Sequence, residues 1–536
     1  MREPVRFLRR VAVAAAIACT APILAAPLPA FAAETPVRGG TLTAIIQPEP
    51  PLLVMGLNQQ APTQTVAGKI YESLLTYNFD LSPRPSLAKS WEVSDDGLTY
   101  TFHLQTGVTW HDGAPFSADD VLFTFKTFLP ETHPRARALF GRAESITAPD
   151  ANTVVIKLKE PFPAFLQGFE VSTTPIMPKH IYAGTDFRTN PKNATPIGTG
   201  PFMFDKWEKG SFIHLVANPH YWQAGKPYLK DIYFKIIPDA ASRALALENG
   251  DVMQSQYNDI EPFDVARLAK LPNLTMTKKG YEFVAPLMWL ELNTRVAPLN
   301  DKRFRQAMMY ALDRKFIRDK IWFGLGRIAT GPINSVTKYY DGDVKKYDYD
   351  PKKAIKLLEE MGLKPDSDGV RATVKFMPLP YGETWQRLGE YVKQAMGKVG
   401  VKIELESTDA AGWGKREANW DFDITSDFLY QYADPSIGVS RTYISSNIRK
   451  GVMFSNTMGY SNPEVDKLFE TAAKENDPKL RQEDYSRLQK LIVEDVPVAW
   501  LLEMEFPTIL NKRVHNAITT AIGVNETYAD AWVSPK

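Results

Sequence analysis

The sequence predicts an α/β protein built from two or three domains. Its 536 residues are too many for one ordinary hydrophobic core, because a domain usually holds about 100 to 200 residues. Helical and extended patterns alternate between residues 350 and 405, which is typical of an α/β lobe. Between Leu98 and Leu104 apolar and polar residues alternate with the period of a half-buried antiparallel strand, so β structure is expected outside that lobe as well.

The N-terminus has the pattern of a secretory signal peptide. Four arginines within the first ten residues precede the apolar, Ala-rich run 11–26, and Ala30-Phe31-Ala32 is an A-x-A cleavage site. We therefore expect residues 1–32 to be removed and the mature chain to begin near Ala33, in the periplasm. Cleavage before Cys19 to give a lipoprotein is the alternative that the sequence leaves open.

Composition excludes several classes of function. The 63 Lys and Arg balance 62 Asp and Glu, so no charge excess indicates binding to nucleic acid or to an anionic membrane. Cys19 is the only cysteine, and its removal with the signal peptide would exclude disulfides, zinc–thiolate sites and cysteine nucleophiles. No segment after the signal is apolar enough to span a bilayer.

In the first half of the chain, two strands and two helices are defined by local patterns. Gly39-Gly40 leads into an apolar strand at 42–46, and alternation predicts another at 154–158. Ser117 is expected to cap a helix together with Asp120, and that helix should bury Val121, Leu122, Phe125 and Phe128. A second helix is expected around 240–247, before Asn249-Gly250.

The second half contains the alternating helices and strands. Asp301 should cap one helix, and Asp350-Pro351 should start another that ends before Gly362. The helix expected at 384–399 is followed at once by the strand 401–405. Two more helices are expected at 463–472 and 480–493.

Residues 85–128 carry a long ordered motif. It reads LA-x-SW-x-x-SDDG-x-x-YTF-x-L and then GV-x-W-x-DG-x-PF-x-A-x-DV-x-F, without a gap. This motif resembles the signature of the family 5 extracellular solute-binding proteins, the peptide- and nickel-type receptors of ABC importers. IYESLL at 70–75 and NPHYW at 218–222 also match, so the resemblance covers nearly the whole mature chain.

The resemblance implies a two-lobed periplasmic binding protein of the large three-domain type, with the ligand cleft between the lobes. The expected parts are a signal peptide at 1–32; domain I at 33–75, 196–282 and 506–536; the small, mostly β domain II at 76–195; and the α/β domain III at 283–505. Such receptors bind at the lobe interface and close by hinge motion.

The resemblance also implies a function. The chain should be a monomeric binding protein that delivers a small-molecule solute to the permease and ATPase subunits of an ABC importer. We find no catalytic motif, and we expect no metal and no cofactor. A chaperone or ligand-sensing role without transport is a second hypothesis, and a secreted hydrolase is a third for which no residues are found.

The resemblance implies where a peptide ligand would be held. Peptide receptors of the family bind the α-ammonium with an aspartate three residues before an acidic-Pro pair; here the pair is Asp434-Pro435 and the position is Gln431. Dipeptide receptors bind the carboxylate with an arginine before Pro-Tyr; here Leu379 precedes Pro380-Tyr381. Short free-amine dipeptides are therefore expected to bind poorly, unless a shifted register supplies Asp427 or Asp434.

The remaining candidate ligand contacts are mostly aromatic side chains near these anchors, which can stack on rings or sugar faces. The ligand is expected to be peptide-like or another small organic solute, with an oligosaccharide, an opine or a conjugate as the alternative. The full set of candidate ligand-binding residues is Gln431, Tyr430, Tyr432, Trp413, Tyr381, Leu379, Trp289, Glu291 and Gln47.

Overall fold

The computed structural model describes residues 35–257 and 259–535. The described residues from Val37 onward form one compact unit. The predicted signal peptide and Cys19 therefore lie outside the described residues. Among the described helices, none is both long and apolar enough to cross a membrane.

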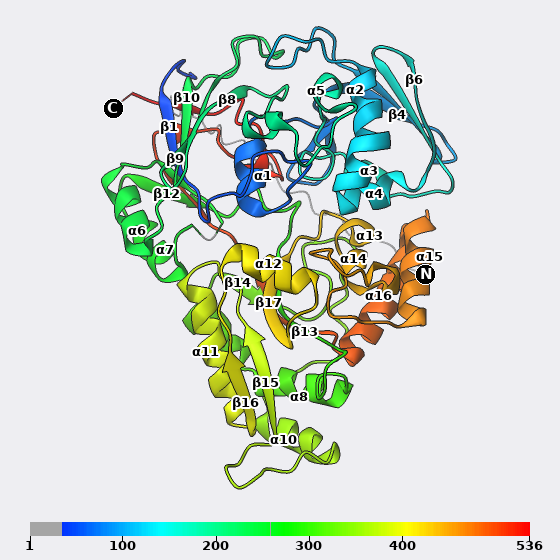
Figure 1. The fold of residues 1–536 in the computed structure, drawn as a ribbon, viewed down its shortest axis with the longest axis vertical. Coiled ribbons are helices and arrows are strands. Elements are labelled where there is room, and N and C mark those ends of the chain that lie inside the picture. The colour runs from blue at the N-terminus through cyan, green and yellow to red at the C-terminus, as the bar shows by residue number, and fades with distance from the viewer. Residues whose placement is uncertain (1–34, 258, 536) are drawn as a thin grey trace, which may run out of the picture. The chain divides into compact units, whose positions relative to one another are not determined.

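A seven-stranded sheet gathers strands from both ends of the chain (Figure 1). Its order is β12-β19-β11-β1-β10-β9-β8, and β1 runs parallel to β10. Helices α6 (Ala240–Asn249) and α7 (Pro262–Leu268) pack on β1 through Leu247, Leu268 and Ile45. The strands are β1 Thr41–Ile45, β8 Phe202–Glu208, β9 Phe212–Ala217, β10 Asp231–Lys235, β11 Gln254–Ser255, β12 Leu274–Thr277 and β19 Thr508–Asn511.

A four-stranded antiparallel sheet, β4-β5-β7-β6, follows in the chain. The alternation at 98–104 is confirmed as strand β5, and Ser117 and Asp120 form the expected capping box of α2. Leu122, expected in the buried stripe, is only partly buried, whereas Phe123 is buried, and the helix continues as a π-helical turn from Thr124. The elements are β4 Ala88–Val93, β5 Thr99–Leu104, β6 Ala143–Asp150, β7 Thr153–Leu158, α2 Ala118–Phe123, α3 Leu129–Thr132, α4 Pro134–Phe140 and α5 Lys179–Tyr182.

A six-stranded mixed sheet, β14-β18-β13-β17-β15-β16, carries the remaining long helices. The expected caps Asp301 and Asp350 are confirmed, since each accepts a hydrogen bond from the first turn of its helix. The elements are β13 Leu287–Leu292, β14 Gly326–Ile328, β15 Ala372–Met377, β16 Val401–Leu405, β17 Ile424–Leu429, β18 Val498–Met504, α8 Lys302–Ala311, α10 Pro351–Glu360, α11 Glu383–Gly397, α12 Ala410–Ala418, α15 Pro463–Lys474 and α16 Pro478–Asp495.

Short elements complete the chain. The helices are α1 Ala61–Ala67, α9 Arg314–Phe316, α13 Pro435–Gly438 and α14 Ser440–Tyr443, and the strands are β2 Leu75–Tyr77, β3 Pro83–Pro85, β20 Val514–His515 and β21 Trp532–Val533. The π-helical turns are η1 Thr124–Phe128 and η4 Ile317–Ile321, and the 3₁₀ turns are η2 Phe165–Gly168, η3 Pro191–Ala194, η5 Ser445–Asn447 and η6 Gly523–Asn525.

Two segments connect the six-stranded sheet to the seven-stranded sheet. Residues 278–286 lead from β12 to β13, and residues 505–507 lead from β18 to β19. We refer to residues 37–282 and 506–535 as the first lobe and to residues 283–505 as the second lobe. Every strand of the six-stranded sheet comes from the second lobe, and every strand of the other sheets from the first. The connections at the lobe boundary are short enough to serve as hinges.

Candidate functional site

Three adjoining cavities lie where residues of the two lobes meet. The central cavity, about 40 Å³, is lined by Gln59, Gln60, Ala61, Arg135, Tyr381, Asp427, Phe428, Leu429, Tyr430, Tyr432, Arg441 and Phe454. A second cavity, of about 350 Å³, is also lined by Arg137, Arg142 and Arg449, and we call it the arginine cavity. The central cavity shares Arg135, Arg441 and Phe454 with it. A third cavity, of about 20 Å³, is also lined by Gln47, Tyr257 and Asp259, and we call it the side cavity. The central cavity shares Ala61, Tyr381 and Phe428 with it. The shared walls show that the three cavities are neighbours.

An aromatic wall extends from the end of β17. Phe428, Tyr430 and Tyr432 alternate along the chain, with ring centroids 5.9 and 5.8 Å apart in succession. Tyr381 adds an edge-on contact to Phe428, at 6.4 Å. The Tyr430 hydroxyl is buried beside Tyr257. This wall offers ring faces and hydroxyl groups to a ligand.

Asp427 is the acidic group of the central cavity. Its side chain is buried, and its Oδ2 atom has no hydrogen-bond partner within the described part of the chain. Glu291, on the neighbouring strand β13, pairs in register with Thr425, two residues before Asp427. Because residues two apart share a face of a sheet, Glu291 and Asp427 lie on the same side. Glu417 of α12 is also buried, so three carboxyl groups are enclosed together.

The enclosure changes the protonation of these carboxyl groups. Burial raises the pKa of Glu291 to about 7, although Thr457 donates a hydrogen bond of 2.7 Å to its carboxylate. Burial, and then the nearby Glu291, raises the pKa of Asp427 well above its ordinary value. Water is excluded from the ionised form, and the neighbouring negative charge opposes it further. A cationic group entering the cavity would favour ionisation of Asp427 and would release a proton.

Two arginines from different lobes contact the aromatic wall. The Arg135 guanidinium lies 3.9 Å from the centroid of the Tyr432 ring, and that of Arg441 lies 5.8 Å from it. Arg135 also donates to Gln59 Oε1 at 3.2 Å and to the Ser172 carbonyl at 2.8 Å. The central cavity is therefore acidic at Asp427 and basic at the wall that it shares with the arginine cavity.

The structure brings some of the predicted ligand-binding residues together and leaves others elsewhere. Tyr381, Tyr430 and Tyr432 line the central cavity, and Gln47 lines the side cavity, where its backbone N–H donates to Asp259 at 3.1 Å. The other five do not line these three cavities. They are Gln431, Trp413, Leu379, Trp289 and Glu291.

Four of these five are held in the body of the second lobe by packing and hydrogen bonds. The Trp413 indole donates to Thr425 Oγ1 at 2.8 Å, and the Leu379 N–H donates to Ser426 Oγ at 2.9 Å. Trp289 is buried in β13 and directs its indole N–H at Glu291, at 3.4 Å. The side chains of Trp413, Leu379 and Trp289 are buried, and burial together with the charge of Glu291 raises the pKa of Asp427.

Gln431 and Asp434 both have partners within the second lobe. Gln431 Oε1 accepts from the Asn334 N–H at 3.2 Å, and its amide nitrogen donates to the Pro332 carbonyl at 3.3 Å. Asp434 caps α13, as expected, and forms a buried ion pair of 2.9 Å with Arg481. Of the acidic residues considered in this segment, only Asp427 lines the central cavity.

Several cavity residues were not predicted from the sequence. Phe428 could have been found, because it continues the alternation of Tyr430 and Tyr432 with period two. No local sequence pattern marks the other residues as ligand contacts, because only folding brings their distant segments to one cavity. They are Arg135, Arg441, Gln59 and Gln60.

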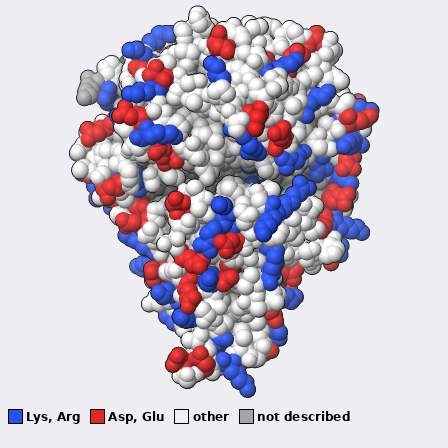
Figure 2. All heavy atoms as spheres, viewed as in Figure 1, with Lys and Arg blue, Asp and Glu red and all other residues white. Residues whose placement is uncertain are grey.

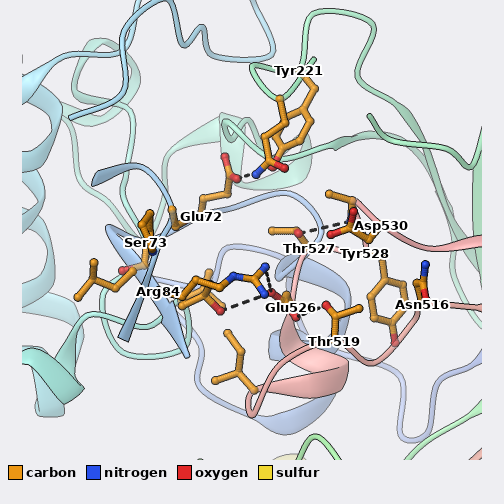
Figure 3. Close-up of a pocket in the computed structure, with 18 of the residues that line it drawn as sticks. Glu72, Ser73, Arg84, Tyr221, Asn516, Thr519, Glu526, Thr527, Tyr528 and Asp530 are labelled. Carbon is orange, nitrogen blue, oxygen red and sulfur yellow. Dashed lines mark hydrogen bonds and ion pairs between the residues drawn. The ribbon is translucent and has the colours of Figure 1, made fainter. Parts of the chain in front are cut away.

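A separate small cavity within the first lobe, of about 40 Å³, is shown in Figure 3. Its acidic side chains have partners within the protein: Glu526 lies 3.9 Å from Arg84, and Glu72 accepts from the Tyr221 hydroxyl at 2.8 Å. Burial raises the pKa of Glu72 to about 7. These contacts join distant segments of the chain, and we assign the cavity a structural role.

The described residues contain no group of three or more His, Cys, Asp or Glu side chains arranged to hold a metal ion. His214, for example, is engaged by Asp205 at 2.7 Å and Asp231 at 3.0 Å, and it stacks on Tyr233.

Comparisons with known proteins agree with this architecture. Residues 82–456 match the model of the middle region of the bacterial extracellular solute-binding proteins, family 5. Protein XP55 of Streptomyces lividans is 31% identical, covering 86% of this chain and 84% of its own. The probable D,D-dipeptide-binding periplasmic protein DdpA of Escherichia coli is 30% identical, covering 84% and 86%.

Solved structures give the same result. The oligopeptide-binding protein AppA of Bacillus subtilis, in complex with a nonapeptide, superposes with a TM-score of 0.84 at 26% identity, covering 94% of this chain and 100% of AppA. The Agrobacterium protein AgaA, in complex with agropinic acid, gives 0.82 at 25% identity, covering 93% and 99%. The chain therefore belongs to family 5 of the bacterial extracellular solute-binding proteins, which are binding receptors and not enzymes.

Proposed function

We propose that this protein is the periplasmic substrate-binding component of an ABC importer and captures a small organic solute in the central cavity. The observation that carries the proposal is the unpaired, buried Asp427 beside the aromatic wall of Phe428, Tyr430 and Tyr432. A monomer would close its two lobes over the solute and present it to the permease and its ATPase. The short connections at 278–286 and 505–507 support such a closure.

The ligand is peptide-like or an amino-acid conjugate such as an opine. AppA was solved with a nonapeptide and AgaA with agropinic acid, and both superpose on nearly the whole chain. At about 40 Å³ the central cavity has room for only one end of such a solute, and its carboxyl group, hydroxyls and aromatic faces suit a polar end group.

Asp427 is the proposed partner of a ligand amine. An ammonium group buried by lobe closure needs a paired charge, because its desolvation without one is expensive. Gln431 is engaged by Asn334 and Pro332, so its neutral side chain does not set the ligand preference. We propose that free amines bind at Asp427, in place of the expectation from the sequence that short free-amine peptides are disfavoured.

The test is binding of the solute that co-purifies with the protein from its own periplasm, identified by native mass spectrometry. Asp427→Asn should weaken its affinity by about two to three decades, the range for losing one partner of a buried charge pair. Glu503→Gln is the matched control and should leave the affinity unchanged, since Glu503 is another buried carboxyl group of the second-lobe sheet, lies outside the three cavities and pairs with Arg327. Calorimetry that gave Asp427→Asn the affinity of the unmutated protein would refute the role of Asp427.

A further inference from the structure

The arginine cavity is large and carries one sign of charge. Its volume is about 350 Å³, against about 40 Å³ for the central cavity. Five arginines line it, and no Asp or Glu does so in residues 35–257 and 259–535. The five are Arg135, Arg137 and Arg142 from the first lobe, and Arg441 and Arg449 from the second. Figure 2 shows a hollow across the face in view that is bordered by Lys and Arg side chains.

The two arginines shared with the central cavity have only neutral hydrogen-bond partners. Arg135 donates to Thr173 Oγ1 at 3.2 Å, in addition to Gln59 and Ser172. Arg441 donates to the carbonyls of Gly438 at 3.1 Å and Phe454 at 3.2 Å. Neither guanidinium forms an ion pair within 4 Å in the described part of the chain.

The positive charges of Arg135 and Arg441 also repel each other. Desolvation, and then the nearby Arg135, lowers the pKa of Arg441 to about 10, although the more distant Asp427 and Glu417 act in the opposite direction. Arg142 is partly neutralised by Glu160, at 3.7 Å, and lies over the Phe162 ring. Because Arg135 and Arg441 repel each other and neither is ion-paired in the described part of the chain, an anion that enters between them is stabilised by both.

We infer that the arginine cavity binds a part of the ligand that carries two negative charges, such as a phosphate monoester or a pair of carboxylates. This rests on the proposed function, because it describes the other end of the same solute. A single carboxylate could accept from both guanidinium groups but would balance only one of their two charges, whereas a dianion balances the charges of both Arg135 and Arg441. The Ser446 hydroxyl, on the second-lobe side of the same cavity, can donate to one of the remaining oxygens.

The position of Arg441 connects the two ends. It lines both cavities and lies close enough to Asp427 for their charges to interact. A ligand with an amine at Asp427 and its acidic part among the arginines would extend through the central cavity along Tyr432. The solute class is therefore an acidic amino compound, such as a peptide or conjugate with a dianionic end.

The experiment measures binding of two probes, inorganic phosphate and succinate, by calorimetry at constant ionic strength with chloride as the reference anion. The full-length mature protein should bind at least one of them, and a variant carrying both Arg135→Gln and Arg441→Gln should bind it at least about thirtyfold more weakly. Arg188→Gln, which removes an exposed arginine outside the cavity, should leave binding unchanged. Preference for phosphate or for succinate distinguishes the two kinds of dianion.

The double variant could lose its fold, so a second comparison uses Arg137→Gln with Arg449→Gln, at exposed positions of the same cavity. This pair should weaken binding by a smaller factor while the melting temperature stays at that of the unmutated protein. The inference is overturned if neither probe binds, or if the double variant binds as tightly as the unmutated protein.

The co-purified solute separates this inference from the proposed function. A solute that depends on Asp427 but carries no dianionic group would uphold the proposed function and overturn this inference. Phosphate or succinate binding that depends on the arginines, with no organic solute bound at Asp427, would overturn the proposed function and leave an anion site.

Discussion

The guanidinium of Arg135 lies 3.9 Å from the centroid of the Tyr432 ring, so a side chain of α4 in the first lobe stacks on the second lobe at the central cavity. Tyr432 is buried, and its backbone has a φ of 49°, a left-handed conformation that is rare for an aromatic residue. Contact between the lobes and the shape of the ligand wall therefore depend on the same ring.

We expect Tyr432→Leu to weaken ligand-dependent closure. Leucine loses the cation–π contact with Arg135, worth about 0.5 to 2 kcal/mol, and removes one face of the cavity. Small-angle scattering should show compaction of the unmutated protein on addition of the co-purified solute and less compaction of the variant at equal concentration. Tyr349→Leu, at an exposed position, is the control and should compact normally. Equal compaction of both variants would contradict a role of Tyr432 in closure.

Gln431→Asp should destabilise the protein without creating an amine site. The shorter carboxylate loses the donor to the Pro332 carbonyl and part of the reach to the Asn334 N–H. Leaving buried partners unsatisfied typically lowers the free energy of unfolding by about 1 to 3 kcal/mol. Urea unfolding measures this loss, and calorimetry with a panel of free-amine dipeptides measures binding. Tighter dipeptide binding by the variant would show that position 431 does reach the ligand.

Glu291 should make stability fall as the pH rises toward neutrality. Its pKa is about 7 in the folded protein, above the ordinary value of 4.5, so the folded state keeps a proton that the unfolded chain loses between these values. The contribution of Glu291 to the free energy of unfolding is therefore fully present below about pH 4.5 and is lost as the pH rises to 7. The loss is about 3 kcal/mol, because one pKa unit corresponds to about 1.36 kcal/mol. The glutamine in Glu291→Gln does not titrate. The free energy of unfolding of this variant should therefore fall by about 3 kcal/mol less over the same pH range.

The measurement is urea unfolding at intervals between pH 4 and pH 8. Glu503→Gln is a control of the same chemistry at another buried glutamate of the second-lobe sheet, one that is paired with Arg327 at 3.2 Å. An unchanged pH dependence in Glu291→Gln would mean that Glu291 ionises normally in the folded protein.

Arg481→Met should be strongly destabilising. Its ion pair with Asp434 is 2.9 Å long and both side chains are 4% exposed, so the variant leaves Asp434 buried without its cation. Breaking such a pair from one side costs about 3 to 5 kcal/mol. Arg487→Met, on the same helix α16 but in an exposed pair with Glu464, should stay close to the unmutated protein. Chemical denaturation of the two variants tests the difference, and equal stabilities would contradict it.

The sequence by itself determined the family and most of the regular structure. The strand β5, the capping box of Ser117 and Asp120, and the helix start at Asp350-Pro351 follow from interactions between residues a few positions apart. Such local preferences are present in the unfolded chain and agree with the final fold. The ordered motif at 85–128 is enough to indicate the fold class, and the family match over 82–456 agrees with it.

Only the tertiary structure decided which polar groups share the cavity. The sequence places Gln431 at the position of the ligand amine and offers Asp427 only if the register is shifted. The fold hydrogen-bonds Gln431 to Asn334 and Pro332 and leaves an oxygen of Asp427 unpaired at the cavity. Arg135 and Arg441 carry no local sign of a shared role, because their contact with Tyr432 exists only once the two lobes meet. Burial and unpaired charge are properties of the assembled surfaces, and a linear pattern of residue types does not contain them.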